Sequence, residues 1–176
     1  MSSFKLKILL IGATSVGKRS LVQRFIKNRF AANYKLTVGV DILTKDVEFR
    51  SGEFATLSIW DIGGQQRFEF IRSTLYKGAA GILIIFDLTR EQTYTQARKW
   101  LAEIQQFIGE KIPFVLIGNK VDLLNNLRAT IDRNRAQLFA EKQGSIYIET
   151  SATTGVNVDE AIQELTRRII DSRTPN

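Results

Sequence analysis

The stretch that decides the fold is KLKILLI at residues 5–11, followed directly by GATSVGK at residues 12–18. The first piece is an apolar run that stops at a glycine, which predicts a buried strand. The second has the spacing G-x-x-x-x-G-K, and KRSLVQRFIKN at residues 18–28 repeats apolar side chains with a helical period. A strand, a glycine-rich turn and a helix in this order predict a loop whose backbone N–H groups and lysine hold a phosphate.

The rest of the chain alternates buried strands with helices. Further strands are expected at residues 41–50, 54–60, 79–86, 112–117 and 145–148, and further helices at 91–108, 132–143 and 156–170. This order predicts an α/β fold with a mostly parallel six-stranded sheet and helices on both faces. The hairpin through Ser51-Gly52-Glu53 adds one antiparallel edge strand. We expect a single domain over residues 1–176, with a core of about 5–171 and a short flexible C-terminal tail.

Composition excludes several kinds of chemistry. The chain has 176 residues and neither cysteine nor histidine, so disulfides, thiol nucleophiles, Cys/His zinc sites and Ser-His triads are excluded. Catalysis would use carboxylates, amides, lysine, arginine, hydroxyls or a hard metal ion. The apolar runs are far shorter than the ~20 residues of a membrane helix, and no signal peptide is evident, so we expect a cytoplasmic protein.

Positive charge is concentrated in the first 40 residues. The net charge is +7, and residues 1–40 hold eight lysines and arginines without one acid. A solvated basic face is the favoured interpretation, with weak contact to anionic membranes as an alternative. A nucleic-acid-binding domain is a poorer alternative because the segment lacks a platform of aromatic residues interleaved with basic ones.

Two further motifs follow predicted strands and would meet the phosphate loop at one sheet edge. In DIGGQ at residues 61–65, Asp61 could hold a metal ion through water, Gly64 could donate its N–H to a γ-phosphate, and Gln65 could orient a water. In NKVD at residues 119–122, Asp122 could accept from N1–H and the 2-amino group of guanine, which adenine does not offer together. These features favour guanine over ATP as the nucleotide.

The chain resembles the Ras-like small GTPases and is most similar to their Rab branch. The resemblance covers about residues 5–171 and rests on GATSVGK, TVGVD at 37–41, WDIGGQ at 60–65, NKVD and ETSA at 149–152. It implies a P-loop NTPase G domain that binds GDP or GTP with Mg²⁺ and hydrolyses GTP as a molecular switch in signalling or vesicle trafficking. It also implies effector, exchange-factor and activating-protein contacts at residues 30–41 and 62–76, in a monomer that binds no nucleic acid.

The resemblance assigns a role to each matching position. Thr37 would ligate Mg²⁺ and Asp61 would hold it through water, while Gln65, Lys18 and Gly64 would serve catalysis. Phe30 would stack on the guanine edge and Tyr34 would cover the phosphates. The full set of nucleotide contacts implied is Gly12, Thr14, Ser15, Val16, Gly17, Lys18, Arg19, Ser20, Phe30, Tyr34, Thr37, Gly64, Asn119, Lys120, Asp122, Ser151, Ala152 and Thr153.

Arg19 is the main departure from the family pattern. The family has Ser or Thr there, whose hydroxyl ligates Mg²⁺, whereas a guanidinium cannot ligate a cation. Ser20 points about 100° away on a helix and is a poor substitute. We therefore expect weak or absent Mg²⁺, a shift toward GDP and slow turnover. The alternative is a catalytically silent, GDP-bound relative that acts as a binding module. Without cysteine, no lipid anchor is expected on this chain.

Overall fold

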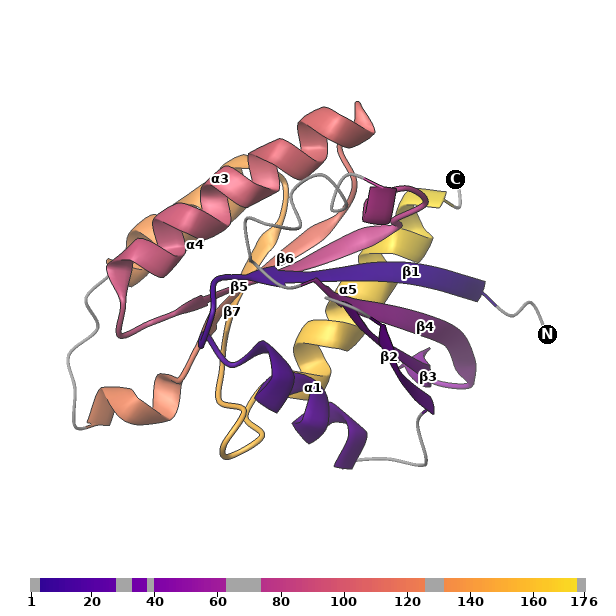
Figure 1. The fold of residues 1–176 in the computed structure, drawn as a ribbon, viewed down its shortest axis with the longest axis horizontal. Helices are drawn as coiled ribbons and strands as arrows, with labels where there is room; N and C mark the ends of the chain where they lie inside the picture. The colour runs from indigo at the N-terminus through magenta and orange to yellow at the C-terminus, as the bar shows by residue number, and fades with distance from the viewer. Residues whose placement is uncertain (1–3, 28–32, 38–39, 63–73, 126–131, 174–176) are drawn as a thin grey trace.

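The structure is a computed structural model that describes residues 4–27, 33–37, 40–62, 74–125 and 132–173. One sheet has the strand order β2-β3-β4-β1-β5-β6-β7, with helices on both of its faces (Figure 1). The strands are β1 (Phe4–Gly12), β2 (Asn33–Thr37), β3 (Val40–Arg50), β4 (Glu53–Ile62), β5 (Gly81–Asp87), β6 (Phe114–Asn119) and β7 (Ile146–Thr150). The helices are α1 (Lys18–Lys27), α3 (Glu91–Ile108), α4 (Arg133–Lys142) and α5 (Val158–Arg173), with a short 3₁₀ helix η2 (Val121–Asn125).

Strand pairing confirms the mostly parallel α/β sheet. β1 lies at the centre between β4 and β5, and β5, β6 and β7 follow in parallel, whereas β3 runs antiparallel to β4. The sheet differs from the prediction by a seventh strand. β2 pairs antiparallel with β3, from Asn33 opposite Thr44 to Thr37 opposite Val40, and takes the edge position expected for β3. The open edge of β3 supplies the hydrogen-bond partners of this short strand.

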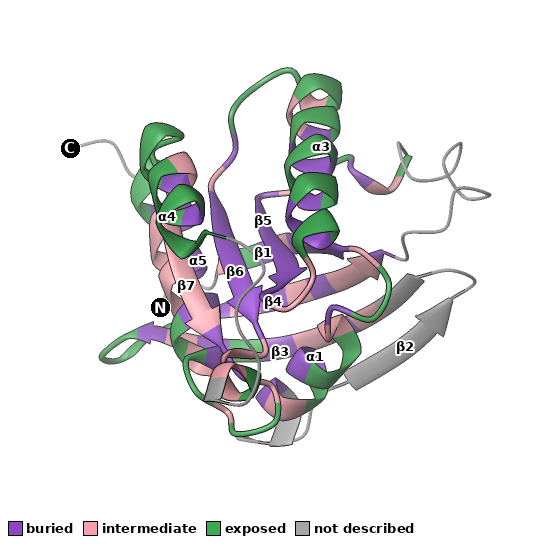
Figure 2. Ribbon diagram, turned by 90° about the vertical axis from the view of Figure 1, so that its left-hand side faces the viewer, coloured by how far each residue is buried: buried purple, intermediate pink, exposed green. Residues whose placement is uncertain are grey.

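Each face of the sheet is covered by its own apolar core. Along β1, Ile8 and Leu10 pack toward α1 and α5, whereas Leu9 and Ile11 pack toward α3 and α4. β5 and β6 are buried along their whole length (Figure 2), which explains their continuous apolar sequences. The molecule is therefore a three-layer sandwich in which the two helix pairs are separated by the sheet.

The helices begin and end at recognisable signals. α3 has the predicted bounds and stops at Gly109, which adopts the left-handed conformation (φ 78°) and donates its N–H to the Gln105 carbonyl. α4 starts after Asp132, whose carboxylate caps it by accepting from the Asn134 N–H at 3.0 Å. Of the helices in the described ranges, none combines the length and the apolar character needed to cross a bilayer.

Parallel pairing places the carboxyl ends of the central strands at one edge. Asp87 of β5 lies opposite Asn119 of β6, and Asn119 lies opposite Thr150 of β7. Gly12, at the end of β1, pairs with Ile85 of β5. The polar residues that end these strands therefore form one row, in the position where ligands bind to open parallel sheets.

Leu10 should be far more important for stability than an exposed leucine. Its side chain is fully buried in the core under α1 and α5, whereas Leu138 on α4 is 54% exposed. We expect Leu10→Ala to lower the free energy of unfolding by about 2–5 kcal/mol because it leaves a cavity. The same truncation, Leu138→Ala, should change it by less than about 0.5 kcal/mol. Urea unfolding of both variants measures the difference, and equal effects would contradict the assigned core.

Candidate functional site

The loop between β1 and α1 has the backbone shape of an anion cradle. Ser15 and Gly17 both adopt positive φ angles, 65° and 102°, a backbone conformation typical of loops whose N–H groups bind an anion. Val16 between them is buried and anchors the loop in the core. The Lys18 ammonium lies across the loop and donates to the Gly12 carbonyl at 2.7 Å. Burial lowers the pKa of Lys18, and the negative charge of Asp61 opposes that shift.

Asn119, the last residue of β6, joins this loop to the end of β7. Its Nδ2 donates to the Val16 carbonyl at 2.9 Å, and its Oδ1 accepts from the Thr150 hydroxyl at 2.9 Å and from the Ala152 N–H at 3.3 Å. The side chain is buried, so these bonds replace those to water. Gly17 packs so closely that a Cβ there would lie 2.3 Å from Nδ2 of Asn119. The conformation of the loop and the position of Asn119 therefore depend on each other.

The buried carboxylate of Asp87 binds Lys120 and Arg90, and both of these residues also contact the loop between β1 and α1. Lys120 Nζ lies 2.9 Å from Asp87 Oδ2 and donates to the Ser15 carbonyl at 3.0 Å. Arg90 lies 3.1 Å from the same Oδ2 and donates to the Thr14 carbonyl at 3.0 Å. Burial alone would raise the pKa of Asp87, but hydrogen bonds from Thr89, Lys120 and Arg90 bring it below its usual value. Sequence reasoning missed Asp87 and Arg90, although an acid directly after a buried strand was a usable signal.

Asp122 of η2 and Ser151, which follows β7, come together. The Ser151 hydroxyl donates to Asp122 Oδ1 at 2.8 Å and accepts from the Thr154 N–H at 3.0 Å. Ala152 is half-buried, and Thr153 is exposed, with its carbonyl 3.3 Å from an Arg24 donor. The Asp122 carboxylate is thus held by the segment that contains the ETSA motif.

The predicted metal-binding residues are only partly described. Asp61 is the next-to-last residue of β4, lies opposite Leu10 of β1 and is half-buried. Arg19 and Ser20 are exposed in the first turn of α1. Within the described ranges no group of three or more acidic residues could hold a metal ion. Phe30, Gly64 and Gln65 lie outside the described residues, as do the side chains of Tyr34 and Thr37; the ranges 30–41 and 62–76 are described only in part.

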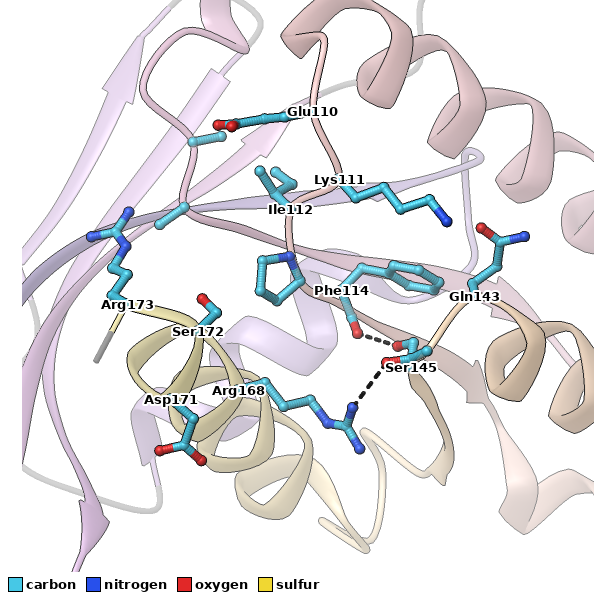
Figure 3. A pocket seen from close by; sticks show the side chains of 14 residues that line it. Glu110, Lys111, Ile112, Phe114, Gln143, Ser145, Arg168, Asp171, Ser172 and Arg173 are labelled. Carbon is cyan, nitrogen blue, oxygen red and sulfur yellow. Dashed lines mark hydrogen bonds between the residues drawn. The ribbon is translucent and has the colours of Figure 1, made fainter. Parts of the chain in front are cut away.

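A separate hollow of about 600 Å³ lies at the opposite edge of the sheet, near the end of α5 (Figure 3). Arg168 there donates to the Gly144 carbonyl and to Glu164, and Ser145 donates to the Phe114 carbonyl. None of the predicted site residues lines it. The carboxyl edge of the sheet, with its loop, amide and carboxylates, is therefore the candidate site.

Comparison with known proteins agrees with this geometry. Residues 7–171 match the model of the Ras family. The chain is 39% identical over 173 residues to Ras-related protein Rab-30 of Homo sapiens, covering 98% of this chain and 84% of that protein. It is 39% identical over 166 residues to Ras-related protein Rab-1D of Dictyostelium discoideum (94% and 80%), and 38% identical over 167 residues to GTP-binding protein YPTM1 of Zea mays (95% and 79%).

Asn119→Asp should lower the stability of the protein at the carboxyl edge of the sheet. The exchange puts a carboxylate oxygen where Nδ2 now donates to the Val16 carbonyl, so two acceptors would face each other. We expect the free energy of unfolding to fall by about 1–3 kcal/mol. Asn134→Asp makes the same exchange on the exposed first turn of α4 and should leave stability within about 0.5 kcal/mol. Thermal and urea unfolding test the pair; an unchanged Asn119→Asp protein would argue against the linking role.

Proposed function

The chain belongs to the Ras family of small GTPases, and we propose that it holds guanine nucleotide at the carboxyl edge of its sheet. Members of this family are GTP hydrolases that bind GDP and GTP with Mg²⁺ and act as switches. The observation that carries the proposed site is the Asn119 amide, which joins the phosphate-type loop to the segment bearing Asp122. Retention of GDP or GTP by the purified chain, read by chromatography after denaturation, tests it.

The phosphates would lie in the loop of residues 12–18. Positive φ angles at Ser15 and Gly17 favour an inward-facing row of N–H groups, and the start of α1 adds positive potential. Lys18 carries its ammonium on the same loop, so it needs only to exchange the Gly12 carbonyl for a phosphate oxygen. A side chain at Gly17 would collide with Asn119, which supports a requirement for glycine there.

The base would be selected by Asp122. Ser151 donates to one oxygen of this carboxylate and restrains its rotation. The carboxylate then accepts from guanine N1–H and the 2-amino group, a donor pair that adenine lacks. The Ala152 N–H is held close by Asn119 and, with Lys120 and Thr153, would complete the base pocket.

Hydrolysis would depend on Lys18 and on residues outside the loop of residues 12–18. Gln65 would orient the attacking water, and Lys18 and the Gly64 N–H would stabilise charge on the γ-phosphate. Phe30 and Tyr34 would enclose the base edge and the phosphates. Effectors and regulators would bind residues 30–41 and 62–76, whose positions we propose to follow the nucleotide state.

Arg19 would make the switch unusual. When bound, Mg²⁺ neutralises charge on the β- and γ-phosphate oxygens. Asp61 and Thr37 would hold it, but Arg19 offers no lone pair where the family has a hydroxyl, and it adds a positive charge. GTP has more charge near that position than GDP, so we propose that GTP binding is weakened more and that turnover is slow.

The same observation favours a second candidate, a GDP-bound relative that does not cycle and serves as a binding module. In that case restoring a hydroxyl at position 19 would change nothing in the native setting. If the restored variant alone performs the cellular function, the second candidate is excluded. If both variants perform it equally without measurable turnover, the binding module is the better description.

Asp122→Asn should change the preferred base. Asparagine presents a donor where the carboxylate accepts, so it repels the guanine 2-amino group and suits the carbonyl oxygen of xanthine. We expect GDP affinity to fall about a hundredfold or more and xanthosine diphosphate to bind better than GDP. Asp132→Asn, at the cap of α4, is the matched control and should retain GDP. Fluorescent nucleotide titrations measure both, and unchanged GDP affinity in Asp122→Asn would contradict the proposed base pocket.

Arg19→Thr should restore a strong Mg²⁺ effect on GTP binding. The variant supplies the missing hydroxyl and removes the competing charge, so Mg²⁺ should tighten GTP binding about tenfold more than in the parent chain. Arg173→Thr makes the same exchange at the exposed end of α5 and should behave as the parent. GTP and GDP affinities with and without Mg²⁺ provide the measurement. An equal Mg²⁺ effect in parent and Arg19→Thr would mean that Arg19 does not impair the metal site.

A further inference from the structure

A groove of about 460 Å³ lies between α3 and α4, on the sheet face away from α1 and α5. Both helices lie on this one face (Figure 2). The floor of this α3–α4 groove includes Leu101, which is buried, and Phe139, which is half-buried. None of the residues assigned to the nucleotide lines it. The groove is therefore a second concave surface, outside the proposed nucleotide site.

The α3–α4 groove is lined by four cations and by no acid. The cations are Arg98 and Lys99 on α3, Lys111 on the following loop, and Arg135 on α4, and all four are exposed. Over the ranges that the structure describes, none of them forms an ion pair. Their charge is therefore not neutralised by the described part of the chain.

The acids of the two helices do not line the groove. Glu91 is exposed at the start of α3, and Glu103 accepts from the Tyr76 hydroxyl at 2.9 Å. On α4, Glu141 accepts from Gln137 at 3.2 Å. The cations therefore act together on whatever occupies the groove, and the electrostatic potential there is positive.

Two of the cations are held in place by aromatic rings. The Arg98 guanidinium lies 4.5 Å from the Phe139 ring centre and 5.9 Å from that of Tyr94, and the Arg135 guanidinium lies 5.6 Å from Tyr94. Contacts of this kind restrain an arginine side chain and leave N–H groups of its guanidinium available for hydrogen bonds. A guanidinium suits a carboxylate, which can accept two parallel hydrogen bonds from it.

Lys111 is positioned by a clamp at the end of α3. The Gln105 side chain accepts from the Ile112 N–H at 3.1 Å and donates to the Ile112 carbonyl at 3.3 Å. The turn at Gly109 brings the chain back toward the helix so that this clamp can form. The clamp therefore holds the backbone next to Lys111 against the end of α3.

We propose that the α3–α4 groove binds an acidic peptide segment of a partner protein. Aspartate or glutamate side chains of the segment pair with Arg98, Arg135, Lys99 and Lys111, and one apolar side chain packs on the floor beside Leu101 and Phe139. The concave shape favours a peptide over an anionic membrane, because a flat bilayer surface would leave the floor of the groove unfilled. The proposal goes beyond guanine-nucleotide binding and uses none of its residues.

The test is selection of a random peptide display library against the whole chain in its purified, nucleotide-bound form. We expect the selected peptides to combine acidic residues with an apolar anchor. Fluorescent copies should bind Arg98→Gln/Arg135→Gln about tenfold or more weakly, and binding should weaken as salt is raised. Glutamine keeps most of the side-chain length. The second variant, Lys99→Gln/Lys111→Gln, changes only exposed lysines and should also weaken binding, so a folding defect in the first would not leave the question open.

The matched control is Lys142→Gln/Arg173→Gln. It removes the same number of charges, from the end of α4 outside the groove and from the lining of the hollow in Figure 3. We expect it to bind the selected peptides as the parent does, and all variants should retain nucleotide. Equal losses in the control, or selected peptides without acids, would overturn the proposal. If no peptide is selected, co-sedimentation with phosphatidylserine vesicles is measured. Co-sedimentation of the parent but not of the groove variants would assign the surface to a membrane and would also overturn the proposal.

Discussion

The buried amide of Asn119 is the contact on which the candidate site depends. It needs a carbonyl for its N–H group and donors for its oxygen, and it finds them in Val16, Thr150 and Ala152. These partners come from two stretches of chain, the loop of residues 12–18 and the segment 150–152, and Asn119 itself belongs to a third. The amide is satisfied only when all three stretches are in place, and an unsatisfied buried amide costs about 1–3 kcal/mol. The contact therefore stabilises the loop and the ends of β6 and β7 together.

The sequence predicts the fold wherever local pattern and burial agree. β5 and β6 are buried on both faces, so their apolar runs are continuous, and α3 has both a clear period and a glycine at its end. β2 is the strand that the prediction lacks. Its five residues, NYKLT, alternate polar and apolar side chains, but so short a run is ambiguous until the open edge of β3 lies beside it, and that edge is a product of the tertiary fold.

The candidate site likewise contains residues that local sequence motifs predict and residues that only the tertiary fold brings together. The phosphate-type loop, Asn119 and Asp122 lie in motifs whose spacing is local, so the sequence predicts them, and the structure brings them to one edge. Arg90 bonds to Thr14 across 76 positions of sequence, and no local pattern indicates such a contact. The cations of the α3–α4 groove are equally dispersed, since Arg98, Lys111 and Arg135 become neighbours only when two helices pack on the same sheet face.

Arg90 connects the start of α3 to the phosphate-type loop. This residue caps the start of α3, and its guanidinium holds both Asp87 and the Thr14 carbonyl of the loop. A displacement of the start of α3 would change the contact between Arg90 and the Thr14 carbonyl, and a change of the loop backbone at Thr14 would change the same contact. Thermodynamic linkage is reciprocal: if a protein that contacts α3 alters the free energy of a ligand held by the loop, that ligand alters the free energy of the contact by the same amount.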